Sequence, residues 1–424
     1  FFDLNEAELV GSTDQVKIVA QLDRFEGAFD GDGDWTTTRR YLLTKDNYWD
    51  AISSELIEDL GEIDSGKPES LVDFAVWAIQ NYPAENYVLV LSNHGSGWLG
   101  AISDEAPGPE KSRMSTNQID QSLADIIAQT GIGQFELVGF DACLMAQMEV
   151  MSALAPYARY AVASQENEPS LGWAYADPLA ELSANPSMSG ADLARMFVET
   201  YIERDLLIVN DQARQLVLAG KELPLDMSAA DLVAQYADTT MSAFDLSAFV
   251  DLHQATNDLA LALEQVDQSS VAGARAYAQM FSPIFIDAEP HFMDLGHFGS
   301  MLMENFPSDA AVQQGVGAVQ AALQRFVIAE KHASQRAGAT GISIYFPNSE
   351  LFQATTGADV GYRDYSSAVA RFSTASLWDD FLRFHYTGKR IDSASADLAV
   401  LDPFTGVPVA LTTPEPEPLG EIIA

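Results

Sequence analysis

The sequence is poor in cysteine and in basic residues, and it lacks long apolar runs. Its one cysteine, Cys143, excludes an internal disulfide and any zinc site built from several cysteines. No run reaches the ~18 uninterrupted apolar residues of a membrane helix, so we expect no membrane insertion. Lysine and arginine number 22 against 62 aspartates and glutamates, and the net charge of −40 is spread along the chain. Such a field repels nucleic acid and anionic membranes and attracts cationic substrates.

The bulk composition predicts a folded protein with a large core. The chain has 424 residues, 47% of them hydrophobic, and this length suggests two or three domains. It begins with Phe1-Phe2-Asp3, with neither an initiator methionine nor a signal peptide, so we expect the numbering to start in a mature or trimmed protein. Strong acidity is typical of solubility in a salty or extracellular setting, and we expect an extracellular or cell-envelope location.

Strand-like and helical segments alternate over the first two hundred residues. Strand-like apolar runs occupy 16–22, 41–44, 87–91, 135–140 and 160–164. Helical apolar periods occupy 71–82, 119–130 and about 145–157. Strands separated by helices predict βαβ units, so the predicted fold class is α/β with a mainly parallel sheet flanked by helices.

Helices dominate the sequence beyond Asp177. They are predicted at 191–203, 229–236, 246–265, 271–280 and 310–332, with short strands at 240–244 and 341–347. We therefore expect an α/β core over residues 1–250 and a mostly helical C-terminal region with a short strand over 251–410. An acidic, proline-rich tail or linker follows over 411–424.

Two motifs follow strand-like runs in the predicted core. The run 87–91 leads into the motif NHGSGW at 93–98, and the run 135–140 leads into FDACLM at 140–145. If the two runs are neighbouring parallel strands, the side chains that follow them emerge at the same carboxyl edge. Open α/β sheets carry their sites at that edge.

The residues in these motifs are those of a cysteine hydrolase. A thiol at Cys143 facing an imidazole at His94 is the minimal catalytic pair, and the interval of about 50 residues is similar to that in caspases. Gly95 and Gly97 leave the histidine loop without Cβ crowding, so the loop can aim an N–H group at a reacting oxygen. A helix beginning soon after Cys143 would direct its N-terminal N–H groups at the sulfur and stabilise the thiolate.

Each motif also has a plainer interpretation. A lone cysteine at a strand end is often a buried small hydrophobe, and a histidine in a turn can lack any role. The loop from Gly95 to Gly100 also matches G-x-G-x-x-G, but the acidic, proline-broken stretch 104–109 follows where a nucleotide site needs a helix. The stretch 30–34 (DGDGD) begins like a calcium loop, but Trp35 and Tyr41 break the EF-hand pattern.

The remaining histidines are not followed by a glycine-rich loop like the one after His94. A five-residue spacing without a nearby cysteine is a poor ligand set, so we predict no metal site. The histidines interpreted as structural are His253, His291, His297, His332 and His385.

Taken together, these segments resemble the clostripain family of caspase-like cysteine peptidases. The resemblance rests on 93–98, on 140–145 and on Ser164-Gln165-Glu166 followed by Gly172-Trp173, in that order and spacing. It extends from about residue 15 to 346 and into the segment 378–386. It implies a caspase-like fold and a cysteine-type endopeptidase. It also implies that peptide or protein substrates are cleaved after Arg or Lys.

The resemblance also implies individual roles. Cys143 is the nucleophile, and His94 delivers a proton to the leaving amine. The backbone N–H groups of Gly95 and Cys143 hold the oxyanion. Asp141 forms the acidic wall of the primary specificity pocket, where a buried carboxylate favours a cationic partner. A second acidic wall is expected from Glu166 or Glu168.

Members of the family are known for activation by loop cleavage and, in some cases, for calcium dependence. The loop after the catalytic histidine carries Lys111 and Arg113, where we expect self-processing. We expect no required cofactor, and calcium dependence stays open.

A different class of function fits the same acidity. The chain could be a catalytically inert acidic binding module that holds cations or basic proteins on the same fold. For the enzyme we expect peptide or protein partners with basic residues, no nucleic acid and a monomeric state.

Overall fold

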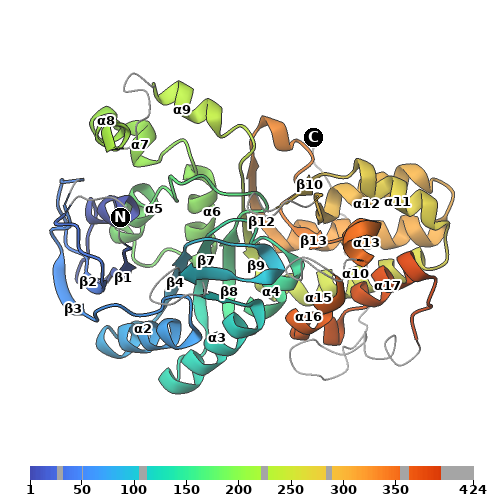
Figure 1. The fold of residues 1–424 in the computed structure, drawn as a ribbon, viewed down its shortest axis with the longest axis horizontal. Helices are drawn as coiled ribbons and strands as arrows, with labels where there is room; N and C mark the ends of the chain where they lie inside the picture. The colour runs from blue at the N-terminus through green and yellow to red at the C-terminus, as the bar shows by residue number, and fades with distance from the viewer. Residues whose placement is uncertain are drawn as a thin grey trace, which may run out of the picture.

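The computed structural model describes residues 1–25, 32–49, 51–104, 112–220, 228–282, 289–353 and 362–392. A five-stranded sheet in the order β12-β9-β8-β7-β4 lies at its centre (Figure 1). Its strands are β4 (Val88–Ser92), β7 (Phe135–Asp141), β8 (Ala158–Ala163), β9 (Thr240–Asp245) and β12 (Val327–His332). β4, β7 and β8 are parallel, whereas β9 and β12 extend the sheet antiparallel. The structure confirms the predicted class, an α/β fold with its sheet between helices.

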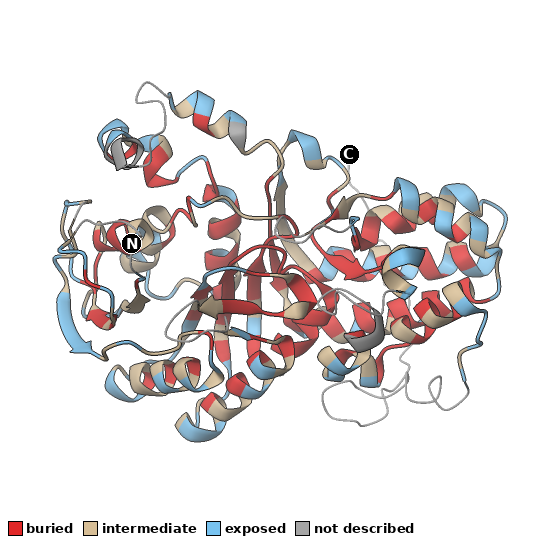
Figure 2. Cartoon of the chain, in the orientation of Figure 1, coloured by how far each residue is buried: buried red, intermediate tan, exposed pale blue. Residues whose placement is uncertain are grey.

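The strand β7 is buried on both faces, which explains its nearly continuous apolar sequence. In β7, Val138 and Phe140 contribute to one apolar cluster and Leu137 to a second, and all three are 0% exposed. Figure 2 shows this central burial. The first cluster includes α2 (Pro68–Asn81) and α3 (Thr116–Thr130), and the second includes α6 (Gly190–Thr200).

Local signals place α3 where the sequence predicts it. The Ser115 side chain accepts a hydrogen bond from the Gln118 N–H, and the Gln118 side-chain oxygen accepts one from the Ser115 N–H. Gly131 ends the helix at φ 74°, a left-handed conformation that glycine adopts without a Cβ clash.

The N-terminal strands do not join the central sheet. β1 (Val19–Asp23), β2 (Thr38–Leu42) and β3 (Glu55–Asp59) form a separate antiparallel sheet beside α1 (Phe2–Glu8). The prediction that βαβ alternation begins at residue 16 is therefore wrong. No helix lies between β1 and β2 in the described part of the chain, and parallel strands require a long crossover, usually a helix.

The C-terminal region packs its helices beside the sheet. The helices that carry most of this packing are α10 (Phe249–Leu263), α11 (Gln268–Tyr277), α12 (Leu295–Asn305), α13 (Ala310–Phe326) and α17 (Trp378–Thr387). A small sheet joins β10 (Met280–Phe281), β11 (Phe292–Asp294) and β13 (Ser343–Tyr345).

The helix predicted at 310–332 is too long. It ends at Phe326, and the next six residues form β12, which pairs with β9 of the core. Pairing with β9 overrides the helical pattern at Val327 and Ile328, whose β-branched side chains suit a strand. The predicted division at residue 250 therefore cuts across the central sheet. The tail at 411–424 lies outside the described residues.

The remaining elements are short or peripheral. They are β5 (Ala101–Asp104), β6 (Ser112–Met114), α4 (Met148–Leu154), α5 (Ala176–Ala184), α7 (Leu206–Val209), α8 (Asp211–Gly220), α9 (Ala229–Gln235), α14 (Ser349–Gln353), α15 (Tyr362–Ala368) and α16 (Ala370–Ala375).

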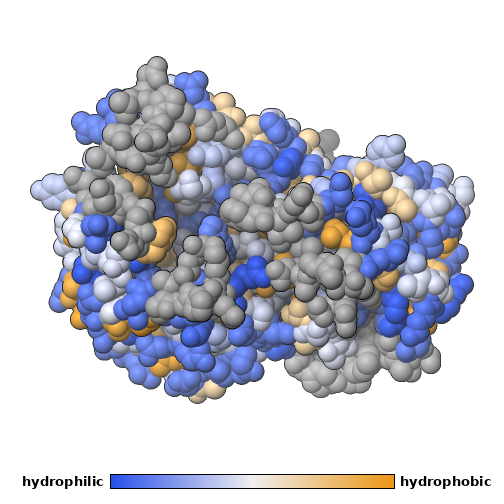
Figure 3. Space-filling view, in the orientation of Figure 1, coloured by the Kyte–Doolittle hydropathy of each residue, from blue (hydrophilic) through white to orange (hydrophobic). Residues whose placement is uncertain are grey.

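The surface reflects the composition. The face in Figure 3 is mostly hydrophilic, with apolar side chains scattered among polar ones. Within the described ranges, no helix combines the length and apolar character needed to span a bilayer.

Candidate active site

The two predicted motifs meet at one edge of the sheet. β4 and β7 are adjacent and parallel, and Ser92 at the end of β4 is in register with Asp141 at the end of β7. The Asn93 N–H donates to the Asp141 carbonyl over 3.2 Å. His94 and Cys143 each follow this last pair by the same two positions, so the predicted shared edge is confirmed.

The loop after His94 packs directly on the cysteine segment. A Cβ added to Gly95 would lie 2.2 Å from the Cys143 carbonyl oxygen and 3.0 Å from its nitrogen. The Ile102 N–H donates to the His94 carbonyl over 3.0 Å, and Gly95 is bridged to Ala101. Only glycine allows this approach, because any Cβ would collide with the Cys143 backbone. The His94 side chain, in contrast, is exposed.

Backbone N–H groups converge on the Cys143 sulfur. Cys143 is 9% exposed, and its Sγ accepts the Glu168 N–H over 3.2 Å. Burial raises the pKa of the Cys143 thiol, and hydrogen bonds from the N–H groups of Glu168, Gly95 and Cys143 itself lower it in part. The N–H donors around the sulfur therefore favour the thiolate, whereas burial favours the neutral thiol.

The helix predicted to stabilise this sulfur begins too late to do so. α4 starts at Met148, and residues 144–147 separate it from Cys143. Leu144 adopts φ 67°, a sharp turn, and the Ala146 carbonyl accepts the Ser343 N–H over 3.0 Å. The segment after Cys143 is thus held by a distant strand, and the expected helix-dipole stabilisation of the thiolate is wrong.

A buried carboxyl pair lies beside the cysteine. Asp141 is 6% exposed, and its Oδ2 accepts the Tyr175 hydroxyl over 2.8 Å and the Trp173 N–H over 3.4 Å. Glu168 Oε2 accepts the Trp173 indole N–H over 3.1 Å. Burial raises the pKa of both carboxyls, and the neighbouring Asp141 raises that of Glu168 further, well above its usual range. The two carboxyls therefore lie in a setting that disfavours two full negative charges beside the sulfur.

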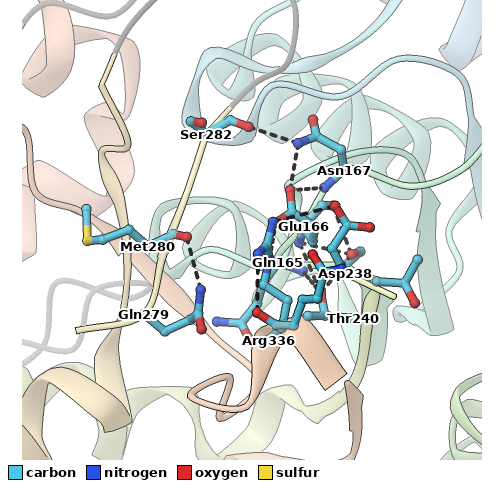
Figure 4. Close-up of polar contacts among 12 residues, drawn as sticks. Gln165, Glu166, Asn167, Asp238, Thr240, Gln279, Met280, Ser282 and Arg336 are labelled. Atoms are coloured by element: carbon cyan, nitrogen blue, oxygen red, sulfur yellow. Dashed lines mark hydrogen bonds and ion pairs between the residues drawn. The ribbon is translucent and has the colours of Figure 1, made fainter. Parts of the chain in front are cut away.

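Glu166 does not join this pair. It is 3% exposed, and its carboxylate is paired with Arg336 (Figure 4). Its other oxygen accepts the backbone N–H and the side-chain amide of Asn167 over 2.8 and 2.6 Å. Because these partners satisfy it inside the protein, the expectation of Glu166 as an acidic wall is not supported, and Glu168 is the carboxyl that joins Asp141.

Three further acids near the pair escaped sequence reasoning. Burial raises the pKa of Asp3 to about 8 and of Asp205 to about 7, and the charge of Asp141 adds to both. Asp3 lies against Gly172, where an added Cβ would be 2.5 Å from its Oδ1. Glu6 on the same helix also has a raised pKa, mainly through burial and then through Asp205. No local motif marks these residues, because only the tertiary fold brings them together.

Of the two predicted processing residues, only Arg113 lies in the described part of the chain. Lys111 is outside the described residues. Arg113 lies in β6, opposite Ser103, and its Nη1 contacts the Ser96 hydroxyl at 3.5 Å. The next residue, Met114, is 1% exposed, so the bond after Arg113 is held within the hairpin.

The histidines interpreted as structural are dispersed. Burial lowers the pKa of His291 and of His385 to about 4, and the Gln279 N–H donates to His297 Nδ1 over 2.9 Å. Within the described ranges, no group of three or more His, Cys, Asp or Glu side chains is arranged to hold a metal ion.

Comparisons with known proteins identify the family of this chain. The sequence profile of the clostripain family matches residues 3–386, whereas no curated protein matches the chain. A secreted C11 cysteine protease from Bacteroides thetaiotaomicron, solved with an irreversible peptide inhibitor, is 20% identical, with a TM-score of 0.57 over 87% of this chain and 93% of that one. An inactive zymogen C11 protease from Parabacteroides distasonis is 14% identical, with a TM-score of 0.53 over 90% of this chain and 91% of that one. These likenesses show the shared fold, and because the family profile covers nearly the whole chain, the protein belongs to the clostripain family of C11 cysteine proteases and is a cysteine-type endopeptidase.

Proposed function

We propose that this endopeptidase cleaves peptide bonds after Arg or Lys, with Cys143 as nucleophile and His94 as acid and base. The observation that carries the proposal is the packing of Gly95 on Cys143 at the shared end of β4 and β7. It brings a histidine loop, a thiol and backbone donors to one place at the edge of the sheet.

The chemistry follows from these groups. His94 takes the thiol proton as the sulfur attacks the substrate carbonyl carbon, and the carbonyl oxygen becomes an oxyanion. The N–H groups of Gly95 and Cys143 donate to that oxyanion, an interaction worth about 2.7–4 kcal/mol per donor in other enzymes. His94 then protonates the leaving amine, and water hydrolyses the thioester to release the acid and regenerate the thiol.

The carboxyl pair supports the preference for a basic residue. Asp141 and Glu168 lie beside the sulfur, and burial, which raises the pKa of both carboxyls, makes an unpaired negative charge there costly. A guanidinium or ammonium entering the site pairs with that charge and relieves the cost of burying it. The same acidity would disfavour acidic residues before the scissile bond.

Self-processing and location remain proposals of the same kind. One structural neighbour is an inactive zymogen and another is a secreted protease, and we propose that this chain is likewise exported and matures by cutting itself after Lys111. The burial of Met114 argues against Arg113 as the preferred position.

A fluorogenic peptide panel that varies only the residue before the scissile bond tests the proposal. We expect cleavage after Arg and Lys, and loss of all cleavage in both Cys143→Ala and His94→Ala. Members of a catalytic unit act together, so the double variant should be scarcely slower than either single one. Slow alkylation of Cys143 by iodoacetamide, with no cleavage of any peptide, would instead favour the inert acidic module.

A further inference from the structure

The loop that carries His94 ends in an anchor buried in the C-terminal region. Trp98 is 1% exposed, and its ring centroid lies 5.3 Å from those of Tyr345 and Tyr365, edge-on at 66° and 84°. The two tyrosine rings lie 4.7 Å apart. Such edge-to-face contacts favour one orientation of the indole, so the C-terminal tyrosines fix where the loop ends.

The backbone of the same loop is held by the segment that follows Cys143. The Trp98 N–H donates to Gln147 Oε1 over 2.8 Å, and the Trp98 carbonyl accepts the Thr116 hydroxyl over 2.7 Å. Gly97, at φ 62°, leaves room for the Gln147 amide, which an added Cβ would approach to 2.3 Å. The His94 loop therefore has an anchor at each end: Gly95 against Cys143, and Trp98 between Gln147 and the tyrosines.

One buried carboxyl holds both tyrosines. Glu149 on α4 is 1% exposed, and its Oε1 accepts the Tyr345 N–H over 2.9 Å and the Tyr365 hydroxyl. The Tyr345 carbonyl in turn accepts the Trp378 indole N–H over 2.7 Å. Glu149 thus ties α4 of the core to β13 and α15, the two elements that enclose Trp98.

We propose that Glu149 is a positioning residue, which keeps the His94 loop over Cys143 by holding Tyr345 and Tyr365 against Trp98. It touches neither the substrate nor the reacting atoms. The proposal does not depend on which residue the enzyme prefers before the scissile bond. It gives the C-terminal region a part in catalysis, because two walls of the Trp98 site come from that region.

The ionisable groups around Glu149 are few. Tyr345 and Tyr365 face it directly, and Asp379, whose pKa burial raises to about 6, acts on Tyr365. Burial likewise raises the pKa of Glu149 to about 7. A glutamine in place of Glu149 keeps an oxygen acceptor for both tyrosines but carries no charge. The variant Glu149→Gln therefore shows whether the hydrogen bonds or the charge of Glu149 matter for activity.

Four variants of the full chain test the proposal. Glu149→Ala removes the acceptor, Tyr365→Phe removes one donor but keeps the ring on Trp98, and Glu149→Gln restores the acceptor. Tyr386→Phe is the matched control, because it removes a tyrosine hydroxyl bonded to the Pro347 carbonyl in the same region. Circular dichroism and thermal melts establish that each variant is folded.

Two rates are then measured: cleavage of a fluorogenic peptide with arginine before the scissile bond, and alkylation of Cys143 by iodoacetamide across pH. We expect Glu149→Ala and Tyr365→Phe to lower kcat at least tenfold, with KM changed less than twofold. The pH midpoint of alkylation should also move upward, because the His94 loop no longer supports the thiolate. Glu149→Gln should keep kcat within about threefold of wild type, and Tyr386→Phe should match wild type in both rates.

Normal kcat and an unchanged alkylation profile in folded Tyr365→Phe would overturn the proposal. So would a rise in KM alone, or the same loss in Tyr386→Phe. If Glu149→Ala does not fold, the comparison of Tyr365→Phe with Glu149→Gln still tests the proposal. The alkylation measurement needs no substrate, so a wrong assignment of basic-residue preference would leave it unaffected.

Discussion

Replacing Asp141 with asparagine removes a carboxylate beside Cys143 and leaves the shape of the site nearly unchanged. Truncating one member of a desolvated charge pair typically costs about 2–5 kcal/mol. At tenfold per 1.36 kcal/mol, that range corresponds to about 30-fold to several thousandfold in kcat/KM. Asp141 is 6% exposed, which places its pairing with a substrate cation within this desolvated regime.

The second carboxyl of the pair sets where in that range the loss should fall. The charge of Asp141 raises the pKa of Glu168, so without Asp141 the carboxyl of Glu168 ionises more readily. It then supplies part of the lost charge, so we expect a loss near the lower end, about 10²-fold on an arginine substrate. Glu168→Gln alone should cost less, and the double variant should lose more than either.

The assay is kcat/KM on two peptides that differ only in Arg or Gln before the scissile bond, because the claim concerns differential transition-state binding. Cleavage after Gln should fall far less than cleavage after Arg, since an amide does not depend on the charge. Equal losses on both peptides would show that Asp141 supports the site through Tyr175 and Trp173. The preference for a basic residue would then need another source.

Three further predictions use other measurements. Purified wild type should yield two fragments that stay associated, with a new N-terminus after Lys111, whereas Cys143→Ala stays intact on a denaturing gel; the same fragment from Cys143→Ala would assign the cut to a contaminant. Burial raises the pKa of Glu149 from 4.5 to about 7, so the folded state binds more protons, and the free energy of unfolding should fall as pH rises across that interval. Glu149 should contribute on the order of 3 kcal/mol to this decrease in the free energy of unfolding. Urea titrations at pH 5 and pH 8 should therefore show a smaller decrease in Glu149→Gln than in wild type, and an equal decrease in the two proteins would contradict ionisation of a buried Glu149. Dialysis against EDTA should leave peptide cleavage unchanged, and restoration of lost activity by calcium would instead reveal a calcium requirement.

The shared sheet edge could be predicted because it depends on local patterns and one topological rule. Two apolar runs predict buried strands, the segment between them contains a helix, and parallel neighbours end at the same edge. The structure pairs β4 with β7 in this way. The strand order and the number of strands in the sheet could not be predicted from the sequence, because β9 and β12 join the sheet from distant parts of the chain.

The acidic pocket could be predicted only in part, for a physical reason. Asp141 ends β7 two positions before Cys143, so its place follows from the sequence, but Asp3 and Asp205 reach it through tertiary packing alone. Glu166 and Glu168 lie two positions apart in one segment, but only Glu166 is paired with Arg336, which lies far along the sequence. The late start of α4 has a similar origin, because the Ser343 N–H binds the Ala146 carbonyl and holds the turn after Cys143 outside the helix.

The contact between Gly95 and Cys143 leads to the sharpest structural prediction. Alanine at position 95 would place a Cβ 2.2 Å from the Cys143 carbonyl oxygen, a separation that requires the histidine loop to move by about 1 Å. A misplacement of that size can cost about 10²-fold in rate, and it would also withdraw the Gly95 N–H from the oxyanion. We therefore expect Gly95→Ala to lower kcat by at least about 10²-fold while the chain remains folded. Gly133→Ala is the matched control, because an added Cβ there meets nothing within 4 Å. If Gly95→Ala cleaved peptides as fast as Gly133→Ala, the close packing of the two loops would not be a condition for catalysis, and the N–H group of Gly95 would have no part in holding the oxyanion.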